Sequence, residues 1–123
     1  MQAAIQLIDS TRSRWLINMS DLTNGNSYQN AFTYNSSKLS AEWILERPTV
    51  NNVLASLANF GRITFTNCEA TIGNATETIN SGIALQIVMY TETSNPGNAQ
   101  QLVDVSSVNQ NGTEFSVTYL SPQ

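Results

Sequence analysis

The stretch Arg14–Tyr34, "RWLINMSDLTNGNSYQNAFTY", contains two runs of alternating apolar and polar residues on either side of a polar turn. Trp15, Ile17 and Met19 occupy alternate positions of the first run. The pair Asn24–Gly25 lies between the runs, and both central positions of a tight hairpin turn favour the positive φ that Asn and Gly tolerate. The stretch therefore predicts an antiparallel hairpin, in which a strand over 28–34 pairs back onto a strand over 14–21.

The same kind of short strand recurs along the rest of the chain. No segment shows a helical period, and runs rich in Val, Ile, Thr, Phe, Tyr and Trp alternate with polar turns. The connections are too short for parallel crossovers, so we expect antiparallel pairing. The pattern predicts one all-β domain over residues 1–123, a sandwich or a barrel. About eight strands are expected, over 3–9, 14–21, 28–34, 40–46, 60–71, 83–91, 102–108 and 114–120.

Three of these segments carry more specific expectations. Residues 83–91, "IALQIVMYT", are apolar on both faces, which is typical of a strand buried in the middle of a sheet. Residues 47–59 form a loop that begins with a proline-containing pair and has room for one helical turn. Gly61 permits a bend where the strand over 60–71 begins; after it, Ile63 and Phe65 should face the opposite side from their polar neighbours.

The charge balance limits the classes of partner and of chemistry. Five Lys and Arg face nine Asp and Glu, for a formal charge of -4 and a pI near 4.4, which disfavours nucleic acid and anionic membranes as partners. The chain has no histidine, so any acid-base chemistry falls to carboxylates, Tyr, Lys or Cys. We expect no membrane span, since no run of 18 apolar residues occurs, and the start of the chain does not resemble a signal peptide.

The chain has one cysteine, Cys68. A single cysteine forms no internal disulfide and no cysteine-based zinc site. Cys68 lies within the run expected to form the strand over 60–71. We therefore interpret it as a small buried residue rather than a reactive thiol.

The stretch Ser40–Pro48, "SAEWILERP", places two glutamates on one face of an expected strand. Glu42 and Glu46 share that face with Ile44, while Trp43 and Leu45 occupy the other. One reading is a solvated outer face. The other is a carboxylate that lines a cleft, where desolvation would raise its pKa and make it a better general acid or base. The spacing alone does not choose between them.

This stretch belongs to a longer resemblance. "SAEWILERP" and, after a loop, "LANFGRITFTNCEAT" over 57–71 resemble the paired signature of the glutamic peptidases, or eqolisins. Their usual pattern is close to Ala-Glu-Trp-Ile-Val-Glu, a loop, and Phe-Ala-Asp-Phe-Gly-x-Val-x-Phe-Thr-Asn-Ala. Upstream, "WLINMSDLTNGNSY" is similar to a hairpin in which such proteins carry a Thr-Gly turn. The match runs from about Ile5 to the C-terminus.

The resemblance implies a concanavalin-like or jelly-roll-like β-sandwich of two curved antiparallel sheets. It also implies a secreted acid endopeptidase that uses a glutamate and a glutamine, with protein or peptide substrates and with neither a metal nor a cofactor. The second glutamate of the signature is the catalytic one and falls on Glu46, which would act as general base and then as acid to the leaving amine. For Glu42 we expect a substrate-binding or supporting role. Trp43 is expected in the core, since it faces away from the glutamates.

The resemblance covers only the C-terminal part of such peptidases. Their catalytic glutamine lies upstream in a Leu-Gln-Thr-Gly segment, which does not occur here. Gln2, Gln6 and Gln29 precede Glu46, but none has a matching context, so the role is transferred to none of them. We expect a partial sandwich that self-associates or binds a complementary N-terminal segment. The alternative is a non-catalytic β-sandwich module that binds peptide or carbohydrate.

Overall fold

The computed structural model describes residues 1–120, and its regular structure there is almost entirely β-strand. Ten strands and two short 3-10 turns are present, η1 over Ile79–Ser81 and η2 over Pro96–Asn98, and every pair of neighbouring strands is antiparallel. The chain divides into two compact units, Met1–Ser40 and a second that begins at Ala41. Within residues 1–120, no helix is long and apolar enough to cross a membrane.

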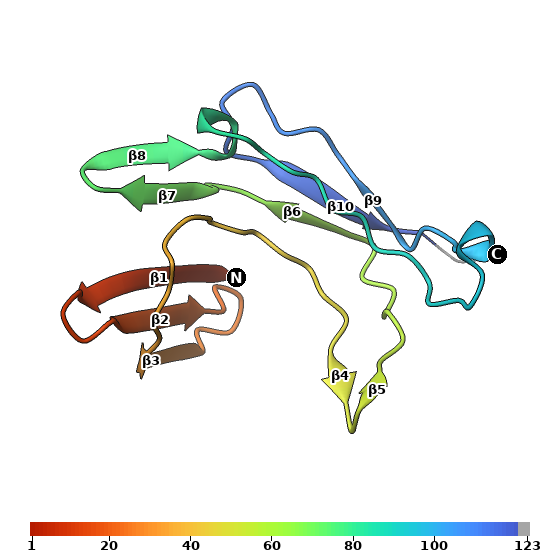
Figure 1. Ribbon diagram of the computed structural model, residues 1–123, viewed down its shortest axis with the longest axis horizontal. Coiled ribbons are helices and arrows are strands. Elements are labelled where there is room, and N and C mark those ends of the chain that lie inside the picture. Colours follow the sequence, from red (N-terminus) through yellow and green to blue (C-terminus); the bar gives the residue numbers. More distant parts are fainter. Residues whose placement is uncertain (121–123) are drawn as a thin grey trace. The chain divides into compact units, whose positions relative to one another are not determined.

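The first unit is a three-stranded sheet in the order β1–β2–β3 (Figure 1). Its strands are β1 over Gln2–Asp9, β2 over Arg14–Ser20 and β3 over Ser27–Thr33. β3 pairs back onto β2, with Trp15 opposite Phe32 and Met19 opposite Tyr28. The predicted hairpin is therefore confirmed.

The turn of that hairpin differs from the expected tight turn. The connection is wider, over residues 21–26, and of its central pair only Gly25 has a positive φ, of 75°. The side chain of Asn24 instead accepts a hydrogen bond from the amide of Asn26 at 2.9 Å. This local bond stabilises the loop in another way, as asparagine side chains commonly do in turns.

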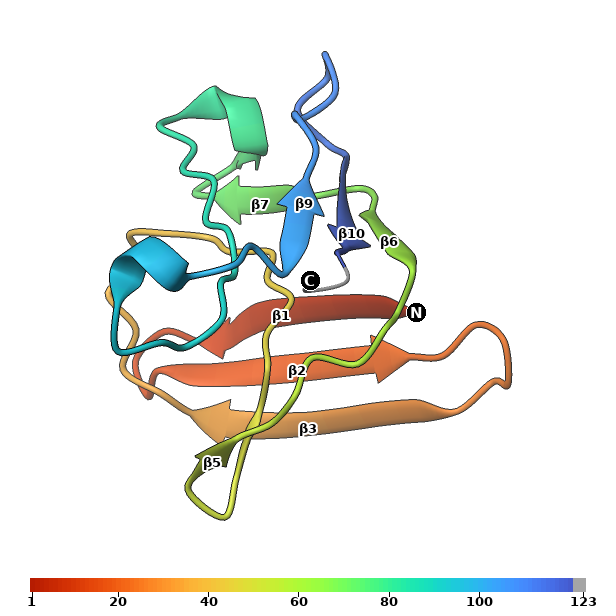
Figure 2. The same cartoon turned by 90° about the vertical axis from the view of Figure 1, so that its right-hand side faces the viewer.

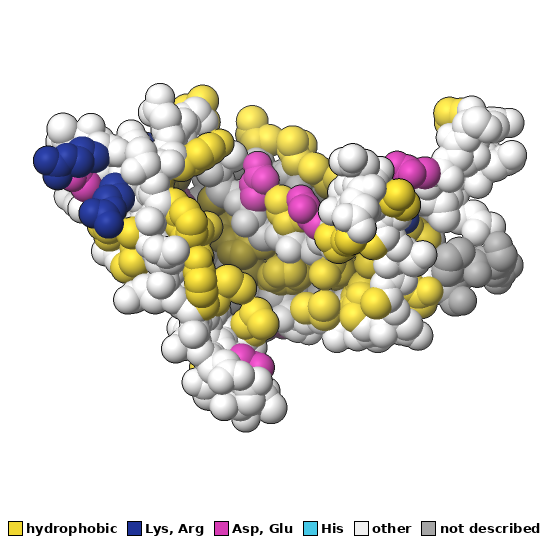
Figure 3. Space-filling model, turned by 90° about the horizontal axis from the view of Figure 1, so that it is seen from below, with side chains coloured by type: hydrophobic (Ala, Val, Ile, Leu, Met, Phe, Trp, Pro, Cys, Tyr) yellow, Lys and Arg dark blue, Asp and Glu magenta, His cyan; other side chains and the backbone are white. Residues whose placement is uncertain are grey.

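The sheet of the first unit has one apolar and one polar face, because directly opposite residues project to the same side. Ile5, opposite Ile17, belongs to the apolar face. The polar face is rich in amides, and there Gln29 donates a hydrogen bond to Asn18. Figure 3 shows that large hydrophobic side chains remain widely exposed on the surface seen there.

The second unit is built on a sheet in the order β6–β10–β9 (Figures 1 and 2). Its strands are β6 over Arg62–Phe65, β9 over Val103–Val105 and β10 over Phe115–Tyr119. Two hairpins accompany this sheet. One pairs β4 over Thr49–Val50 with β5 over Val53–Leu54, and the other pairs β7 over Glu69–Ile72 with β8 over Ala75–Thr78.

The core of the second unit lies on this sheet. Leu102, Val103 and Val117 are buried at its centre, and the rings of Phe65 and Phe115 stack beside them with centroids 4.8 Å apart. Ile63 and Phe65 lie opposite Val117 and Phe115, which confirms the predicted apolar side of this strand. On the polar side, the buried hydroxyl of Ser116 accepts a hydrogen bond from Arg62 at 2.9 Å and shares another with Thr64.

The strand expected over 60–71 is broken into β6 and β7. Gly61, with φ of 66°, makes the expected bend, while Asn67, with φ of 55°, interrupts the strand after Phe65. Cys68 lies in that break rather than in a strand, and its amide donates to the carbonyl of Thr113 at 2.9 Å. It is 1% exposed, so the prediction of a buried cysteine is confirmed. Burial first, and then the charge of Glu114, raise the pKa of its thiol.

The expectation of a buried central strand over 83–91 is wrong for this structure. Only its last residues pair, through hydrogen bonds of 2.8 Å from Leu102 N to Met89 O and from Thr91 N to Gln100 O. Ile83, Leu85 and Ile87 are 95%, 83% and 86% exposed. The physical reason is that residues 1–120 provide no strand on the outer edge of this segment. We call these three side chains the aliphatic row.

Two other expectations also need correction. Residues 47–59 contain the β4–β5 hairpin in place of a helical turn, because Asn51 and Asn52 both adopt positive φ and close a two-residue turn. The segment 40–46 is not part of any strand ladder within the described chain. The strand β8 was not predicted.

Candidate active site

The glutamates of the candidate site lie on an extended segment, Ala41–Arg47, of the second unit. Burial alternates along it: Glu42, Ile44 and Glu46 are exposed, while Trp43 and Leu45 between them are partly buried. The predicted division into two faces is therefore confirmed, although the segment has no ladder partner. Packing of one face on the core, rather than strand pairing, produces this alternation.

Two contacts hold the segment beside Glu46. The side chain of Leu45 packs against the core cluster of Leu102, Val103 and Val117. Arg47 Nη2 donates a hydrogen bond to the carbonyl oxygen of Tyr90 at 3.4 Å. Because neighbouring side chains of an extended chain project to opposite sides, anchoring Leu45 and Arg47 inward directs Glu46 outward.

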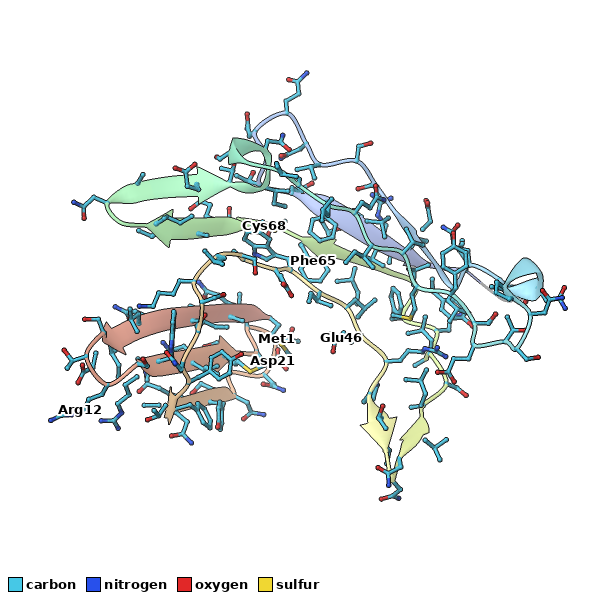
Figure 4. The ribbon with its side chains drawn as sticks, viewed as in Figure 1. Met1, Arg12, Asp21, Glu46, Phe65 and Cys68 are labelled. Atoms are coloured by element: carbon cyan, nitrogen blue, oxygen red, sulfur yellow. The ribbon has the colours of Figure 1, made fainter. Side chains whose placement is uncertain are left out.

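Figure 4 shows Glu46 on the extended segment, on the side away from Phe65 of the core. Its carboxylate is exposed to solvent, as is that of Glu42. Glu42 takes part in an interaction with its surroundings, which is compatible with the expected supporting role. An exposed carboxylate on a fixed backbone can accept a proton from water, or hold a substrate amide by a hydrogen bond.

No cluster of three or more His, Cys, Asp or Glu with metal-binding geometry occurs among residues 1–120. Two surface hollows lie elsewhere, one in the turn 91–99 and one over Gln2, Asn18 and Ser20 of the first unit. Glu46 itself is exposed on the second unit.

The candidate glutamines are in the first unit and Glu46 is in the second. Gln2 and Gln6 lie on β1, and Gln29 lies on β3, all on the amide-rich face. Gln29 is bonded to Asn18. The structure supplies no further reason to give any of them the role of the peptidase glutamine.

Two features beside Glu46 were missed from the sequence. The bond between Arg47 and Tyr90 joins residues that are 43 positions apart, and no local pattern could indicate it. The β4–β5 hairpin does have a local signal, since Asn tolerates positive φ better than most residues and two Asn are adjacent at 51 and 52.

Comparison with known proteins extends this description. A sequence model of the peptidase A4 family matches residues 2–119. Aspergillopepsin-2 from Aspergillus niger is 35% identical over 71 residues, and that match covers 54% of this chain and 25% of the relative. The crystal structure of aspergilloglutamic peptidase from Aspergillus niger is similar with a TM-score of 0.68 and 28% identity. That similarity covers 97% of this chain and 66% of the solved one.

The structural similarity confirms the predicted fold class. The chain is an all-β protein of antiparallel sheets with the sandwich-like fold of a glutamic peptidase. The matches span about a quarter of the curated relative and about two thirds of the solved chain. A substantial part of each relative therefore has no counterpart in this chain.

Proposed function

Because the chain belongs to the peptidase A4 family, the glutamic peptidases, we propose that it carries the catalytic glutamate of an acid endopeptidase and that Glu46 is this residue. The observation that supports the assignment most directly is the alternation along 41–47. Glu46 is exposed next to Leu45, which packs on the core, so its side chain is accessible while its backbone is held in position.

In this mechanism Glu46 acts on a water molecule at the carbonyl carbon of the substrate. The carboxylate takes a proton from the water as its oxygen bonds to the carbonyl carbon. The proton then passes from Glu46 to the amide nitrogen, the C–N bond breaks, and the amine leaves. Glu42, on the same exposed face, contacts the substrate or supports the segment.

The oxyanion of the intermediate needs a donor that this chain does not identify. We propose that a glutamine amide from a complementary segment supplies it, as the family pattern implies. Loss of one such donor costs on the order of 100- to 1000-fold in rate, so the chain alone should cleave very slowly. The proposed substrates are proteins and peptides, and the proposed location is extracellular.

The aliphatic row supports the need for a complementary segment or for self-association. Three large aliphatic side chains at adjacent alternate positions, each more than four-fifths exposed, form a contiguous apolar surface beside unpaired backbone. Such edges pair readily with another strand. We expect the isolated chain to form dimers or larger species in light scattering, and Leu85→Lys to shift it toward monomer. A monomer at high concentration for the unmodified chain would contradict this expectation.

The test of catalysis is digestion of a denatured protein at acidic pH, with an aspartic peptidase inhibitor present. It compares the chain alone and the chain joined to a complementary N-terminal segment that contains the Leu-Gln-Thr-Gly glutamine of the family, each with Glu46 and with Glu46→Gln. We expect the joined form to cleave and Glu46→Gln to abolish cleavage. Cleavage that survives Glu46→Gln would reject the site.

The second candidate function is a binding module for peptide or carbohydrate that keeps the fold without the chemistry. It is favoured by the share of the solved relative that has no counterpart here. Failure of the joined form to cleave, with a peptide still bound, would support it.

A further inference from the structure

The second unit carries an excess of negative charge, and Arg62 has no acidic partner in it. Residues 41–123 contain two Arg against seven Asp and Glu, a formal charge of -5. Among residues 1–120 the only ion pair joins Arg12 to Asp9, in the first unit. Arg62 is therefore unpaired although the unit holds several carboxylates, and its charge is available to a partner outside the chain.

A buried serine holds the guanidinium of Arg62 on the polar face of the β6–β10–β9 sheet. Arg62 Nη2 donates to Ser116 Oγ at 2.9 Å, and Ser116 is 5% exposed. The hydroxyl of Thr64 shares a further bond of 3.2 Å with Ser116. A guanidinium has five N–H donors in a rigid fork, and the bond to Ser116 uses one of them. Arg62 is exposed and makes no other side-chain hydrogen bond within the described chain, so the remaining donors are open to a partner.

Arg62 shares one cross-strand row with an acidic residue. β10 lies between β6 and β9 (Figure 1), and Thr118 of β10 is directly opposite both Arg62 and Asp104. Directly opposite residues project to the same face, so the row reads arginine, threonine, aspartate across the sheet. Arg62 and Asp104 are the only charged residues of these three strands, and both are exposed. Neighbouring strands lie about 4.8 Å apart, which separates the two backbones by about 10 Å, and no ion pair forms between them.

The row is self-complementary under a two-fold rotation. When a second copy lays the same face on this one, with the two-fold axis parallel to β10, β6 of each copy lies over β9 of the other. Arg62 of each copy then faces Asp104 of the other, and Thr118 faces Thr118. Packed sheets lie about 10 Å apart, a gap that a long arginine and a short aspartate bridge together. One face thus supplies both halves of two identical contacts.

We propose that the polar face of the β6–β10–β9 sheet is a contact surface for a second copy of this chain, held by two reciprocal ion pairs between Arg62 and Asp104. The inference is independent of the peptidase chemistry, because neither residue belongs to the segment of Glu46. It adds a charged contact to the apolar one expected through the aliphatic row.

This contact is weak and is governed by charge. The face is polar and spans three strands, so it offers little apolar surface for burial, and small contacts of this kind belong to transient complexes. Charges across an interface mainly determine which surfaces meet and in which register. Exposed ion pairs are screened by salt, with a Debye length of about 8 Å at physiological ionic strength. We therefore expect the association at low ionic strength and high protein concentration.

The test uses the full chain in a Leu85→Gln background, which removes an apolar side chain from the aliphatic row without adding a charge. Two charge-reversal variants are compared in this background, Arg62→Glu and Asp104→Arg. Each variant alone places like charges opposite each other in the two-fold contact. In sedimentation at pH 7 and low ionic strength, each should therefore self-associate roughly tenfold more weakly than the background chain.

The decisive measurement is an equimolar mixture of the two variants. In a mixed pair, the introduced glutamate of one copy faces the introduced arginine of the other, and the unchanged Asp104 faces the unchanged Arg62. Each reversal changes the formal charge of -4 by two, to -6 for Arg62→Glu and to -2 for Asp104→Arg. Both variants are thus negative overall, and only the local row attracts them. We expect the mixture to associate roughly tenfold more tightly than either variant alone, and to lose this gain at about 0.5 M salt.

The matched control reverses the same kinds of charge outside the row. Arg12→Glu and Glu92→Arg, in the same background, also have formal charges of -6 and -2. Their mixture should associate no more tightly than the background chain. A control mixture that gains as much as the row variants would overturn the proposal, because the attraction would then not depend on the row.

A charge exchange within one chain guards against misfolding of the single variants. The double variant Arg62→Glu, Asp104→Arg restores the complementary row in reverse and should recover the self-association of the background chain. A double variant that folds, as judged by its unfolding transition, but associates as weakly as the single variants would overturn the proposal. So would a background chain that stays monomeric at high concentration and low ionic strength.

Discussion

The guanidinium of Arg47 donates a hydrogen bond to the carbonyl oxygen of Tyr90, with Nη2 and O 3.4 Å apart. This bond joins the segment of Glu46 to the pairing region of Met89–Thr91. Arg47→Met removes the donor and keeps an apolar stem of similar length. We expect the free energy of unfolding to fall by about 0.5 to 1 kcal/mol, at the lower end for a hydrogen bond because this one is long. Hydrogen exchange should accelerate at the amide of Thr91.

The control for that variant is Arg12→Met. Arg12 pairs with Asp9 at 3.4 Å in an exposed turn of the first unit, and its side chain is mostly in solvent. Exposed pairs of this kind typically contribute about 0 to 1 kcal/mol. Urea denaturation should show little change for Arg12→Met, and exchange at Thr91 should not respond. Faster exchange at Thr91 in both variants would contradict a specific role for Arg47.

The alternation of Ile44 and Leu45 gives a second prediction, for stability. Leu45→Ala removes a side chain that packs on the core and should lower the free energy of unfolding by about 1 to 2 kcal/mol, below the range for a fully buried leucine. Ile44→Ala removes a similar volume from an exposed position and should change it by about 0.5 kcal/mol or less. Equal losses in urea denaturation would show that the segment does not pack through Leu45.

A third prediction concerns Gly112, whose φ is 74°. A Cβ added there would lie 2.5 Å from Thr78 Oγ1 and 3.1 Å from the backbone nitrogen of Asn80. Gly112→Ala should therefore cost roughly 2 to 4 kcal/mol, from the backbone conformation and from overlap with the turn at η1.

The matched control for Gly112 is Gly73, in the β7–β8 turn. Its φ is 64°, and an added Cβ would meet nothing within 4 Å, so Gly73→Ala should cost about 1 to 2 kcal/mol from the backbone term alone. Thermal or urea unfolding distinguishes the two. If Gly112→Ala and Gly73→Ala lower the free energy of unfolding by similar amounts, the contact of the added methyl group with η1 relaxes without cost.

Cys68 gives a fourth prediction, for the dependence of stability on pH. Burial raises the pKa of its thiol in the folded state, and Glu114 adds to the effect, so the folded protein holds this proton more tightly than the unfolded chain. The resulting stability is complete below the unfolded pKa, about 8.5, and is lost as the pH rises through the folded pKa. Cys68→Ala should remove this loss of stability above about pH 8.5. The prediction is wrong if the free energy of unfolding depends on pH in the same way in the unmodified chain and in Cys68→Ala.

The sequence predicted those parts of the fold in which local pattern and pairing agree. The hairpin of β2 and β3 follows from alternating residues on both sides of a turn, and β6 follows from Ile63 and Phe65 with Gly61 at its start. The shared face of Glu42 and Glu46 was predicted in the same way, because two-residue periodicity survives even without a ladder partner.

The features that the sequence did not predict depend on which other parts of the chain pack or pair with each segment. "IALQIVMYT" reads as a buried strand, but burial requires a neighbour that the described chain does not provide, so Ile83 and Leu85 are exposed. The strand breaks at Asn67, where the chain turns from β6 into β7 and Cys68 enters the interior. No periodic pattern in the sequence indicates this break. The bond between Arg47 and Tyr90 is set by tertiary packing alone.

The absence of a ladder around Ala41–Arg47 has a consequence for which changes this segment accepts. In a paired strand, hydrogen bonds to a neighbour would fix the register, but here the insertion of Leu45 into the core fixes it. Loss or gain of a single residue between Glu42 and Glu46 would exchange the two faces and drive a carboxylate toward the aliphatic core. Folding should therefore tolerate many substitutions on the outer face of the segment, although activity would not, while the length of the segment is constrained residue by residue.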